Sequence, residues 1–340
     1  MQQQKRKNLL YLGNKLAQKN RNLTHLESLS IDLGKEGFAV KTYSSQPNIL
    51  LRLISMLWAL WKNRKQVDMV LIDTYSTTAF WYAYLCGILS NFLKLPYVCI
   101  LHGGDLPKRL KNNPKLCRQL FENAYVNVAP SNYLLEAFQN AGFTNLKYIP
   151  NTIEIKKYQF RHREKLQPKL LYVRSFAYIY NPILSLKVIQ ELLKTYPEAT
   201  LSMVGPFKDN SINECKAFAE KHNLPVTFTG GMQKEEWLEY AQDFDVFINT
   251  TNVDNTPVSV MEAMALGLPV VTTNVGGIPY LIKENEAILV PPNEVETMLK
   301  AIKSLLKNSS LAAELSSKGR KKVEAFDWEQ VKHKWEEVLR

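Results

Sequence analysis

Short apolar runs alternate with longer amphipathic stretches from one end of the chain to the other. The short runs are rich in Val, Ile, Leu and Tyr, whereas the stretches between them repeat apolar residues at a helical spacing. One such stretch, Ile183–Leu193, places Leu186, Ile189 and Leu193 on one side of a helix. Strands that alternate with helices in this way are typical of βαβ units around parallel sheets. The pattern therefore predicts an α/β protein with doubly wound parallel sheets.

The apolar runs form two series, separated by a polar stretch that begins at Pro150-Asn151-Thr152 and ends at Pro168. The first series predicts strands at 8–12, 38–43, 67–73, 97–102, 125–129 and 146–149. The second series predicts strands at 169–173, 200–204, 226–229, 246–249, 269–273 and 287–290. We therefore expect one domain over residues 1–150 and another from residue 151. Two such domains facing across a cleft would hold a ligand at the carboxyl edges of their sheets.

Length and composition agree with two globular domains. The chain has 340 residues, of which 46% are hydrophobic, and this is enough apolar surface for two cores. The four cysteines follow no metal-ligand spacing and are too few for a disulfide framework, so we expect reduced core residues. No apolar run is long enough to span a membrane, and the first residues do not resemble a signal peptide. The sequence predicts a cytoplasmic protein.

The positive charge is concentrated in the first half of the chain. Residues 1–150 contain 19 Lys and Arg against 8 Asp and Glu, whereas residues 151–340 contain 24 of each, so the net charge of +11 lies in the first half. This half could attract an anionic membrane or a phosphorylated acceptor, and general solubility is the simpler interpretation. Nucleic acid is not expected as a partner, because the basic residues are scattered and form no recognisable binding module.

Two apolar helices are candidates for membrane contact. Ile49–Trp61 is followed by Lys62, Arg64 and Lys65, so it could lie in a bilayer interface, although it is too short to span. Packing in the protein core is the alternative. The other helix, within Ser76–Leu93, directly follows a predicted strand, and packing against the sheet explains its apolar residues.

The stretch from Asp254 to Thr273 carries the most chemical information, because it predicts a loop, a helix, a glycine stop and a buried strand. Pro257 suits the first turn of a helix, and the backbone N–H groups around it, from Thr256 to Val260, would be largely unpaired. Such a helix start binds phosphate. We expect the ligand-binding residues there to be Asn255, Thr256, Pro257 and Val258. Glu262, about one turn into the helix, could accept hydrogen bonds from a ribose diol, and Asp254 would lie nearer a sugar.

This stretch resembles the retaining glycosyltransferases of family 4, which have the GT-B fold. Members carry an acidic residue, seven intervening residues and a glutamate here, matched by Asp254 and Glu262. The likeness continues through Ala-Met-Ala-Leu-Gly-Leu-Pro-Val-Val to Gly276-Gly277. The first acid is usually glutamate, and Asp254 shortens its reach by one methylene. The resemblance implies two Rossmann-like domains, with 1–150 on the acceptor side and 151–325 binding the nucleotide sugar.

Further segments resemble the same family in the same order. His102-Gly-Gly-Asp105 occupies the place of a His-Gly segment whose histidine approaches the donor sugar, although a histidine at a strand end can be purely structural. Gly13 resembles the N-terminal glycine loop, which lets the backbone approach phosphate or acceptor. The resemblance thus implies His102, Arg174 and Asp254 as catalytic residues, and it adds Gly13 to the donor-binding set.

Two segments of the second half complete the likeness. Thr229-Gly230-Gly231-Met232 resembles the loop that holds the nucleobase, so Gly230 and Gly231 would let the main chain approach the base. An ordinary turn between strand and helix fits this segment equally well. Phe326-Asp327-Trp328 resembles the start of the last helix, which implies that residues 326–340 cross back to the N-terminal domain.

One departure concerns the cations of the donor site. Family members commonly have a Gly-Arg pair and a lysine after the strand at 169–173, and both cations neutralise the leaving diphosphate. Aligned without a gap, this chain has Ser175 and Tyr180 at those places, while Arg174 lies one position early. Arg174 could still serve as the diphosphate cation. Otherwise the leaving group would depend on the helix start near Thr256 and on a cation of the other domain.

A literal Asp-x-Asp sequence, Asp243-Phe244-Asp245, is the pattern that metal-dependent glycosyltransferases of the other main fold use to bind a divalent cation. It directly precedes the predicted strand at 246–249 and has none of the surrounding features of that fold. We interpret it as solvated acids at a helix end. No metal and no other cofactor are expected, since the nucleotide-diphosphate sugar is a substrate.

The function implied by the resemblance is transfer of a sugar from a nucleotide-diphosphate donor to an acceptor hydroxyl, with retention and without a metal. We expect a glycan, lipid-linked or anionic acceptor, with peripheral contact to an anionic membrane at its inner face. This would serve cell-surface polysaccharide or glycolipid assembly. A nucleotide-sugar epimerase of the same fold is an alternative. A nucleotide-binding scaffold without turnover is another, because Ser175 and Tyr180 replace the usual cations.

Overall fold

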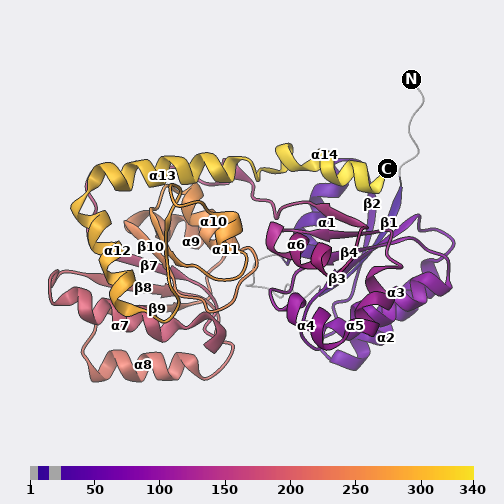
Figure 1. The fold of residues 1–340 in the computed structure, drawn as a ribbon, viewed down its shortest axis with the longest axis horizontal. Coiled ribbons are helices and arrows are strands. Elements are labelled where there is room, and N and C mark those ends of the chain that lie inside the picture. Colours follow the sequence, from indigo (N-terminus) through magenta and orange to yellow (C-terminus); the bar gives the residue numbers. More distant parts are fainter. Residues whose placement is uncertain (1–6, 15–23) are drawn as a thin grey trace. The chain divides into compact units, whose positions relative to one another are not determined.

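The computed structural model describes residues 7–14 and 24–340, which form two compact units (Figure 1). Unit 1 contains the described residues up to Pro150 together with Val331–Arg340, and unit 2 contains Asn151–Gln330. Each unit has one sheet of six strands, all parallel, with helices packed against it. The predicted α/β class with two doubly wound parallel sheets is confirmed.

The sheet of unit 1 has the strand order β2-β1-β3-β4-β5-β6. Its strands are β1 (Asn8–Leu12), β2 (Ala39–Tyr43), β3 (Met69–Thr74), β4 (Tyr97–Leu101), β5 (Val126–Ala129) and β6 (Leu146–Tyr148). The chain goes from β1 to one side to form β2 and then to the other side to form β3. The order therefore reverses between β1 and β3, and ligands of open α/β sheets bind at such a switch point.

Helices of unit 1 cover this sheet and form its core. They are α1 (His25–Lys35), α2 (Ile49–Asn63), α3 (Phe80–Phe92), α4 (Leu106–Asn112), α5 (Pro114–Phe121) and α6 (Asn132–Asn140). Apolar side chains of α2 to α6 pack with those of β1, β3 and β4 in one cluster, in which Phe80, Phe121 and Phe138 are fully buried. These strands are buried along nearly their whole length, as parallel strands covered by helices require.

The sheet of unit 2 has the strand order β12-β11-β10-β7-β8-β9, which is the dinucleotide-binding Rossmann order. Its strands are β7 (Lys169–Val173), β8 (Thr200–Val204), β9 (Val226–Gly230), β10 (Val246–Asn249), β11 (Val270–Thr273) and β12 (Ile288–Val290). The switch point of this sheet lies between β7 and β10, which are neighbours and pair in parallel.

Two hydrophobic clusters form the core of unit 2. The helices are α7 (Pro182–Leu193), α8 (Ser211–Lys221), α9 (Lys234–Tyr240), α10 (Val258–Ala265), α11 (Ile278–Leu281), α12 (Val295–Lys307) and α13 (Ser309–Glu324). One cluster joins the sheet to α7, α8 and α12, and the other joins it to α9, α10 and α11, with α13 contributing to both (Figure 1). Short 3-10 turns, η1 (Ile155–Lys157), η2 (Tyr178–Tyr180) and η3 (Ala241–Asp243), complete the unit.

The last helix, α14 (Trp328–Leu339), begins in unit 2 and packs on unit 1 from Val331 onward. Lys147 and Glu337 form an ion pair there at 2.6 Å. At the other end of the helix, the backbone amide of Ile153 donates to the carbonyl of Phe326 at 3.0 Å. The carboxylate of Asp327 accepts a hydrogen bond from the amide of Ile155 at 2.9 Å.

All twelve strands lie where the sequence predicts them, with ends that differ by at most two residues. Helix α7 likewise matches the predicted stretch Ile183–Leu193 to within one residue. The central strands, such as β3 and β4, are buried on both faces and therefore appear in the sequence as continuous apolar runs, which explains why they could be predicted so closely.

Helix α2 combines the two interpretations that its sequence allowed. Its inner face packs Met56, Ala59 and Leu60 into the core of unit 1, and its other face exposes six large apolar side chains. These are Ile49, Leu50, Leu51, Ile54, Trp58 and Trp61. Helix α3 packs against the sheet as predicted and also leaves Trp81 and Phe92 exposed. Within the described ranges, no helix is both long enough and apolar enough to cross a membrane.

Candidate functional site

The switch point of unit 2 brings two of the predicted catalytic residues together. Arg174 directly follows β7, and Asp254 lies in the loop that follows β10. Because β7 and β10 are adjacent parallel strands, their carboxyl ends meet at one edge of the sheet. The guanidinium of Arg174 binds the carboxylate of Asp254, and the two side chains are only 17% and 9% exposed. The sequence placed both residues in the site without indicating that they pair.

The carboxylate of Asp254 is held by its own loop as well as by Arg174. The backbone amide of Asn255 donates to Oδ1 of Asp254 at 2.8 Å. Burial raises the pKa of Asp254 above its ordinary value, while the positive charge of Arg174 and these hydrogen bonds act in the opposite direction. The carboxylate of Asp254 is thus paired with the guanidinium of Arg174 and is not positioned as an isolated, reactive carboxylate.

Tyr180 supports Arg174 from the other side. The guanidinium carbon of Arg174 lies 4.2 Å from the centroid of the Tyr180 ring, within the range of a cation–π contact. The buried Nε of Arg174 has no hydrogen-bond partner among the described residues. Tyr180, which the ungapped alignment of the sequence places where a lysine is expected, thus contacts a cation through its aromatic ring instead of supplying one.

Helix α10 begins one residue later than the sequence predicts. Pro257 has an extended conformation with ψ of 106° and precedes the first helical residue, Val258. The expectation of a free amide at Val260 is wrong, because this group donates to the carbonyl of Pro257 at 3.1 Å. Within the described ranges, no backbone carbonyl accepts from the amides of Val258 and Ser259, and the buried hydroxyl of Ser259 has no partner. The predicted anion-binding character of this helix start therefore rests on Val258 and Ser259.

The glycine pair Gly276-Gly277 fixes the loop of Asp254 and Asn255. The amide of Gly277 donates to the carbonyl of Asp254 at 3.0 Å. A Cβ atom on Gly276 would lie 2.1 Å from the carbonyl oxygen of Asp254, and one on Gly277 would lie 1.9 Å from that of Asn255. Gly276 also has a positive φ of 54°. Only glycine allows the two backbones to approach so closely.

Glu262 is buried one turn into α10, as predicted, and it has two partners that the sequence did not reveal. The hydroxyl of Tyr158 donates to its Oε1 at 2.9 Å, and the ammonium of Lys234 forms an ion pair with the same oxygen. Lys234 is the first residue of α9, four positions after Gly230. Burial and the charge of Lys157 lower the pKa of Lys234 to about 8. No spacing in the sequence links Tyr158 or Lys234 to Glu262.

Gly230 and Gly231 lie at the end of β9, just before α9 and Lys234. Gly230 ends β9 with a positive φ of 75°, and its carbonyl accepts from the amide of Gly205 at 2.8 Å. Space is open beside Gly230, whereas a Cβ atom on Gly231 would make only ordinary contacts. Their predicted contact with a nucleobase stays a prediction.

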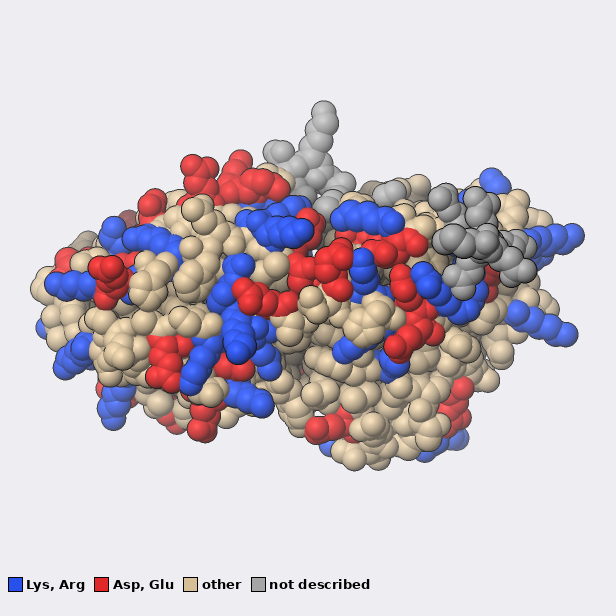
Figure 2. Space-filling model, turned by 90° about the horizontal axis from the view of Figure 1, so that it is seen from above, with Lys and Arg blue, Asp and Glu red and all other residues tan. Residues whose placement is uncertain are grey.

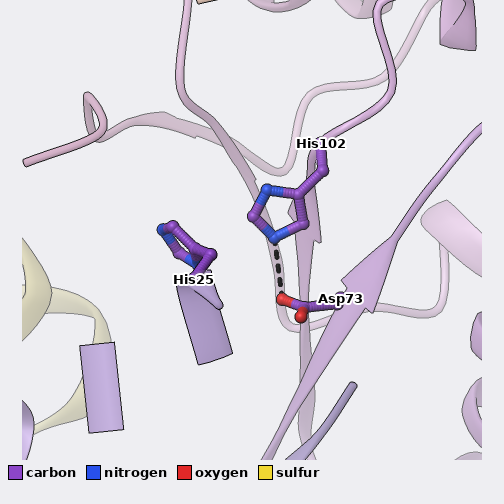
Figure 3. A group of neighbouring side chains, drawn as sticks. All are labelled: His25, Asp73 and His102. Atoms are coloured by element: carbon purple, nitrogen blue, oxygen red, sulfur yellow. Dashed lines mark hydrogen bonds and ion pairs between the residues drawn. The ribbon is translucent and has the colours of Figure 1, made fainter. Parts of the chain in front are cut away.

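In unit 1, four side chains meet near the switch point between β1 and β3. Oδ1 of Asp73 accepts hydrogen bonds from the hydroxyl of Tyr11 at 2.7 Å and from Nε2 of His102 at 2.7 Å. Nδ1 of His25 lies 3.1 Å from the Tyr11 hydroxyl. Figure 3 shows the imidazole of His102 pointing toward Asp73, with His25 beside it. The sequence predicted only His102 of this group.

The charges and hydrogen bonds of these four side chains indicate where the protons of the group lie. Burial lowers the pKa of His25 to about 3, so its ring is neutral at pH 7. The pKa of Tyr11 is raised by burial and by Asp73, so its hydroxyl keeps its proton. Burial acts to raise the pKa of Asp73, but His102, His25 and Tyr11 together lower it. The Tyr11 hydroxyl donates to an ionised Asp73 and so accepts from His25 Nδ1–H.

His25, Asp73 and His102 also offer three ligand types that divalent metals use, with ligand atoms within 4.8 Å of one another. Their hydrogen bonds to each other and to Tyr11 already account for this arrangement. A metal ion would have to replace the bond between His102 and Asp73. The group therefore fits a hydrogen-bonded network better than a metal centre.

Gly13 follows β1 and belongs to the same part of unit 1. A Cβ atom there would lie 2.3 Å from Oδ2 of Asp73, so glycine is required for the strand end to pass this carboxylate. Gly13, Asp73 and Tyr75 line a small pocket beside β1. His102 and Gly13 thus lie in unit 1, whereas all the other predicted site residues lie in unit 2.

One acid of the Asp-x-Asp sequence, Asp245, has a structural role in the interior of unit 2. Asp245 is buried, pairs with Arg163 at 3.3 Å and accepts from the amide of Gln167 at 2.8 Å. Asp243 lies in the turn η3 that precedes it. The expectation of two solvated carboxylates is wrong for Asp245, because its position directly before β10 places it in the interior.

Charged side chains are mixed on the face seen in Figure 2. Lys and Arg lie interspersed with Asp and Glu there, so the positive excess of the chain does not form one continuous basic surface on this face.

Comparison with known protein families covers nearly the whole described chain. The family described as "Glycosyl transferases group 1" matches residues 154–322, and the one described as "Glycosyltransferase Family 4" matches residues 29–157. The boundary between the two matches lies close to the boundary between unit 1 and unit 2.

Curated relatives share parts of the sequence. The sulfoquinovosyl transferase SQD2 of Arabidopsis thaliana is 29% identical over 150 residues, or 42% of this chain and 28% of SQD2. TuaC of Bacillus subtilis, a glycosyltransferase named for teichuronic acid biosynthesis, is 25% identical over 229 residues, or 64% of this chain and 56% of TuaC. The chain thus spans between about a quarter and little more than half of these relatives.

Solved structures share the fold over almost the full chain. Sucrose-phosphate synthase from Thermosynechococcus elongatus superposes with a TM-score of 0.79 at 16% identity, covering 98% of both chains. The Anabaena protein HepE, solved in complex with UDP-glucose, superposes with a TM-score of 0.75 at 17% identity, covering 98% of this chain and 99% of HepE.

Proposed function

The chain belongs to the group 1 glycosyltransferases of family 4, and on this basis we propose that it transfers a sugar from a nucleotide-diphosphate donor to an acceptor hydroxyl. The observation that carries this proposal lies at the switch point of unit 2. There the pair of Arg174 and Asp254 adjoins the start of α10, which leads one turn later to the buried Glu262.

Each part of this arrangement suits one part of a nucleotide sugar. The amides of Val258 and Ser259 and the guanidinium of Arg174 would bind the diphosphate, because helix starts and arginine forks both favour phosphate oxygens. Glu262 would accept hydrogen bonds from the ribose. The main chain at Gly230 and Gly231 would approach the base, and Asp254 and His102 would act at the sugar.

The chemistry is proposed to proceed with retention of the anomeric configuration and without a metal ion. Departure of the diphosphate is assisted by Arg174 and the start of α10, which stabilise developing negative charge. Asp254 is buried against Arg174, so it is not presented as a free nucleophile for a covalent intermediate. The acceptor hydroxyl would then attack on the same face of the sugar that the leaving group departs from.

Thermal stabilisation by nucleotides tests the donor site. Wild type and Glu262→Gln are heated with the uridine, guanosine, adenosine and cytidine diphosphates and their common sugar conjugates, with UDP and UDP-glucose first because HepE was solved with them. A ligand at one hundred times its dissociation constant stabilises by about 2.7 kcal/mol. We expect one base to stabilise the wild type and the effect to shrink in Glu262→Gln.

The matched control for this test is Glu191→Gln on α7, where the carboxylate pairs with Lys194. It should respond to the nucleotide like the wild type. Failure of every nucleotide to stabilise the wild type would remove the donor-site assignment. Conversion of the nucleotide sugar to its epimer, without an acceptor and without net release of nucleotide, would instead favour the epimerase.

We also propose that helix α2 binds an anionic membrane surface, which would bring a lipid-linked or anionic glycan acceptor to unit 1. The exposed apolar face of α2, defined by Ile49, Leu50, Leu51, Ile54, Trp58 and Trp61, has side chains that are between 49% and 66% exposed. An apolar face of this extent with tryptophans is typical of helices that lie in a bilayer interface. The name of TuaC refers to teichuronic acid biosynthesis, which supports an acidic glycan as an acceptor of this class.

Basic residues surround the end of this apolar face. Lys62 lies 4.4 Å from the ring of Trp58, and Arg64 lies 4.4 Å from the ring of Trp61. Cations beside interfacial tryptophans are placed to contact lipid phosphates, each contributing about 1 kcal/mol near an anionic surface. The positive charge of residues 1–150 would add a longer-range attraction that salt weakens.

Vesicle co-sedimentation tests the membrane proposal. We expect binding to phosphatidylglycerol vesicles that decreases with salt, and little binding to phosphatidylcholine vesicles. The double variant Ile54→Glu with Trp58→Glu should lose this binding. Ile31→Glu, which changes an exposed isoleucine of α1, should retain it. Absence of binding to anionic vesicles at low salt would rule the surface out.

A further inference from the structure

Both acids of the predicted donor motif are neutralised by a cation of unit 2. Arg174 pairs with Asp254, and Lys234 pairs with Glu262. Arg174 was expected at the site from the sequence, whereas Lys234 lies on a different helix and matches no family pattern. The second pair therefore raises the question of what this lysine does when a ligand occupies the site.

Lys234 is held at the site by the start of α9. Gln233 caps this helix, and the carboxylate of Glu236 accepts from the amide of Gln233 at 2.9 Å, which completes a capping box. The ammonium of Lys234 lies 5.1 Å from the ring of Tyr158 and 5.7 Å from that of Trp237. Two aromatic rings thus flank the charged end of the lysine where it meets Glu262.

Lys234 can exchange its contact with Glu262 for a stronger contact with a diphosphate. Lys234 and Tyr158 both bind Oε1 of Glu262, so this oxygen already has two donors. A lysine ammonium is a mobile point charge on a flexible stem, and a diphosphate carries more negative charge than one carboxylate. Glu262 lies four residues beyond Val258, so the start of α10 is about 6 Å away along the helix axis. This distance is within the reach of a lysine side chain.

We infer that Lys234 is a second cation for the donor diphosphate, taking the place of the lysine that the family has where this chain has Tyr180. When a nucleoside diphosphate binds, Nζ of Lys234 leaves Glu262 for the phosphate oxygens, and Glu262 becomes available to the ribose hydroxyls. Arg174 and Lys234 then neutralise the leaving group together. This inference rests on the proposed function, since it assumes that unit 2 binds a nucleotide sugar.

Calorimetric titration with a nucleoside and its diphosphate tests the inference. The probes are uridine and UDP, or the corresponding pair for whichever base stabilises the wild type. In Lys234→Gln we expect diphosphate affinity to fall about 10- to 100-fold, the range for loss of a charged hydrogen-bonding partner, while nucleoside affinity stays within a factor of about three. Lys318→Gln, which removes an exposed lysine paired with Glu314 on α13, should change neither affinity.

Lys234→Arg tests the role of the positive charge separately from any effect that Lys234→Gln has on folding. It keeps a cation at the start of α9 and should retain most of the preference for diphosphate over nucleoside, even if Lys234→Gln is poorly folded. Equal losses for nucleoside and diphosphate in Lys234→Gln would show that the lysine acts only through Glu262, and unchanged affinities would show a purely structural ion pair. Either result overturns the inference while leaving the proposed function intact. Failure of the wild type to bind any nucleotide would remove both.

Discussion

The ring of Tyr180 lies 4.2 Å from the guanidinium carbon of Arg174, within the range of a cation–π contact. A tyrosine carries no positive charge, but its ring can orient the guanidinium of Arg174. On the proposed function, Tyr180 therefore supports the cation that binds the diphosphate.

Replacement of Tyr180 should weaken this support. Tyr180→Leu is expected to lower the free energy of unfolding by about 1–2 kcal/mol and to weaken nucleoside diphosphate binding, because a partly buried cation–π contact is lost. Tyr180→Phe keeps the ring and removes only the hydroxyl that hydrogen-bonds to Arg174, so it should lose less than Tyr180→Leu in both properties. Urea unfolding and calorimetric titration measure the two effects. A loss of equal size in both variants would contradict a role for the ring.

The affinity for nucleoside diphosphate should depend on pH through Lys234. Its pKa of about 8 means that raising the pH above 8 removes the positive charge in the free protein, whereas bound phosphate favours the protonated form. Diphosphate affinity is therefore expected to fall as pH rises through 8. The groups facing Lys234 are Glu262 on α10, Lys157, Tyr158 and Glu154 around η1, and Glu235 on α9.

Titration of the wild type and Lys234→Gln between pH 6 and 9.5 checks this expectation. The two proteins share every other group, so the ratio of their affinities isolates the lysine. A ratio that stays constant across this range would show that the charge of Lys234 does not contribute.

The glycine pair of unit 2 predicts a sharp contrast between two substitutions. Gly276→Ala should destabilise the protein by about 1–3 kcal/mol and weaken nucleotide binding, since the new Cβ would lie 2.1 Å from the carbonyl oxygen of Asp254. Gly34→Ala in α1 meets no atom within 4 Å and should stabilise by about 0.5–1 kcal/mol. Thermal unfolding with and without nucleotide measures both, and similar shifts for the two variants would contradict the packing argument.

The network in unit 1 predicts a dependence of stability on acid pH. The folded protein lowers the pKa of Asp73, so its contribution is present above the unfolded value near 4 and is lost as pH falls through the lower folded value. Asp73→Asn should lose about 1–3 kcal/mol at pH 7 and less below pH 4, as expected for hydrogen bonds to a charged group. Urea unfolding from pH 3 to 7 tests this, with Asp105→Asn as a charge-matched control in the same unit. A difference between wild type and Asp73→Asn that is independent of pH would indicate loss of packing only.

Local patterns in the sequence were sufficient for the fold class, for the twelve strands and for placing Asp254 in a loop and Glu262 in the short helix that follows it. Parallel strands buried on both faces leave continuous apolar runs, and the stretch from Asp254 to Glu262 keeps its loop, helix start and acid within nine consecutive residues. A buried strand and a short loop–helix motif are each formed by residues that are neighbours along the chain. These residues can therefore be recognised without a structure.

The pairing of these residues was decided only by the tertiary structure. Lys234 and Tyr158 meet Glu262 from segments 28 and 104 residues away, and His25, Tyr11 and Asp73 surround His102 because β1, β3 and α1 converge at one sheet edge. Parallel strand order places distant segments side by side, and no periodicity records which side chains will then be within hydrogen-bonding distance. The sequence by itself thus determined the fold class and the places of the two acids along the chain, while the strand order of each sheet decided which partner holds each acid.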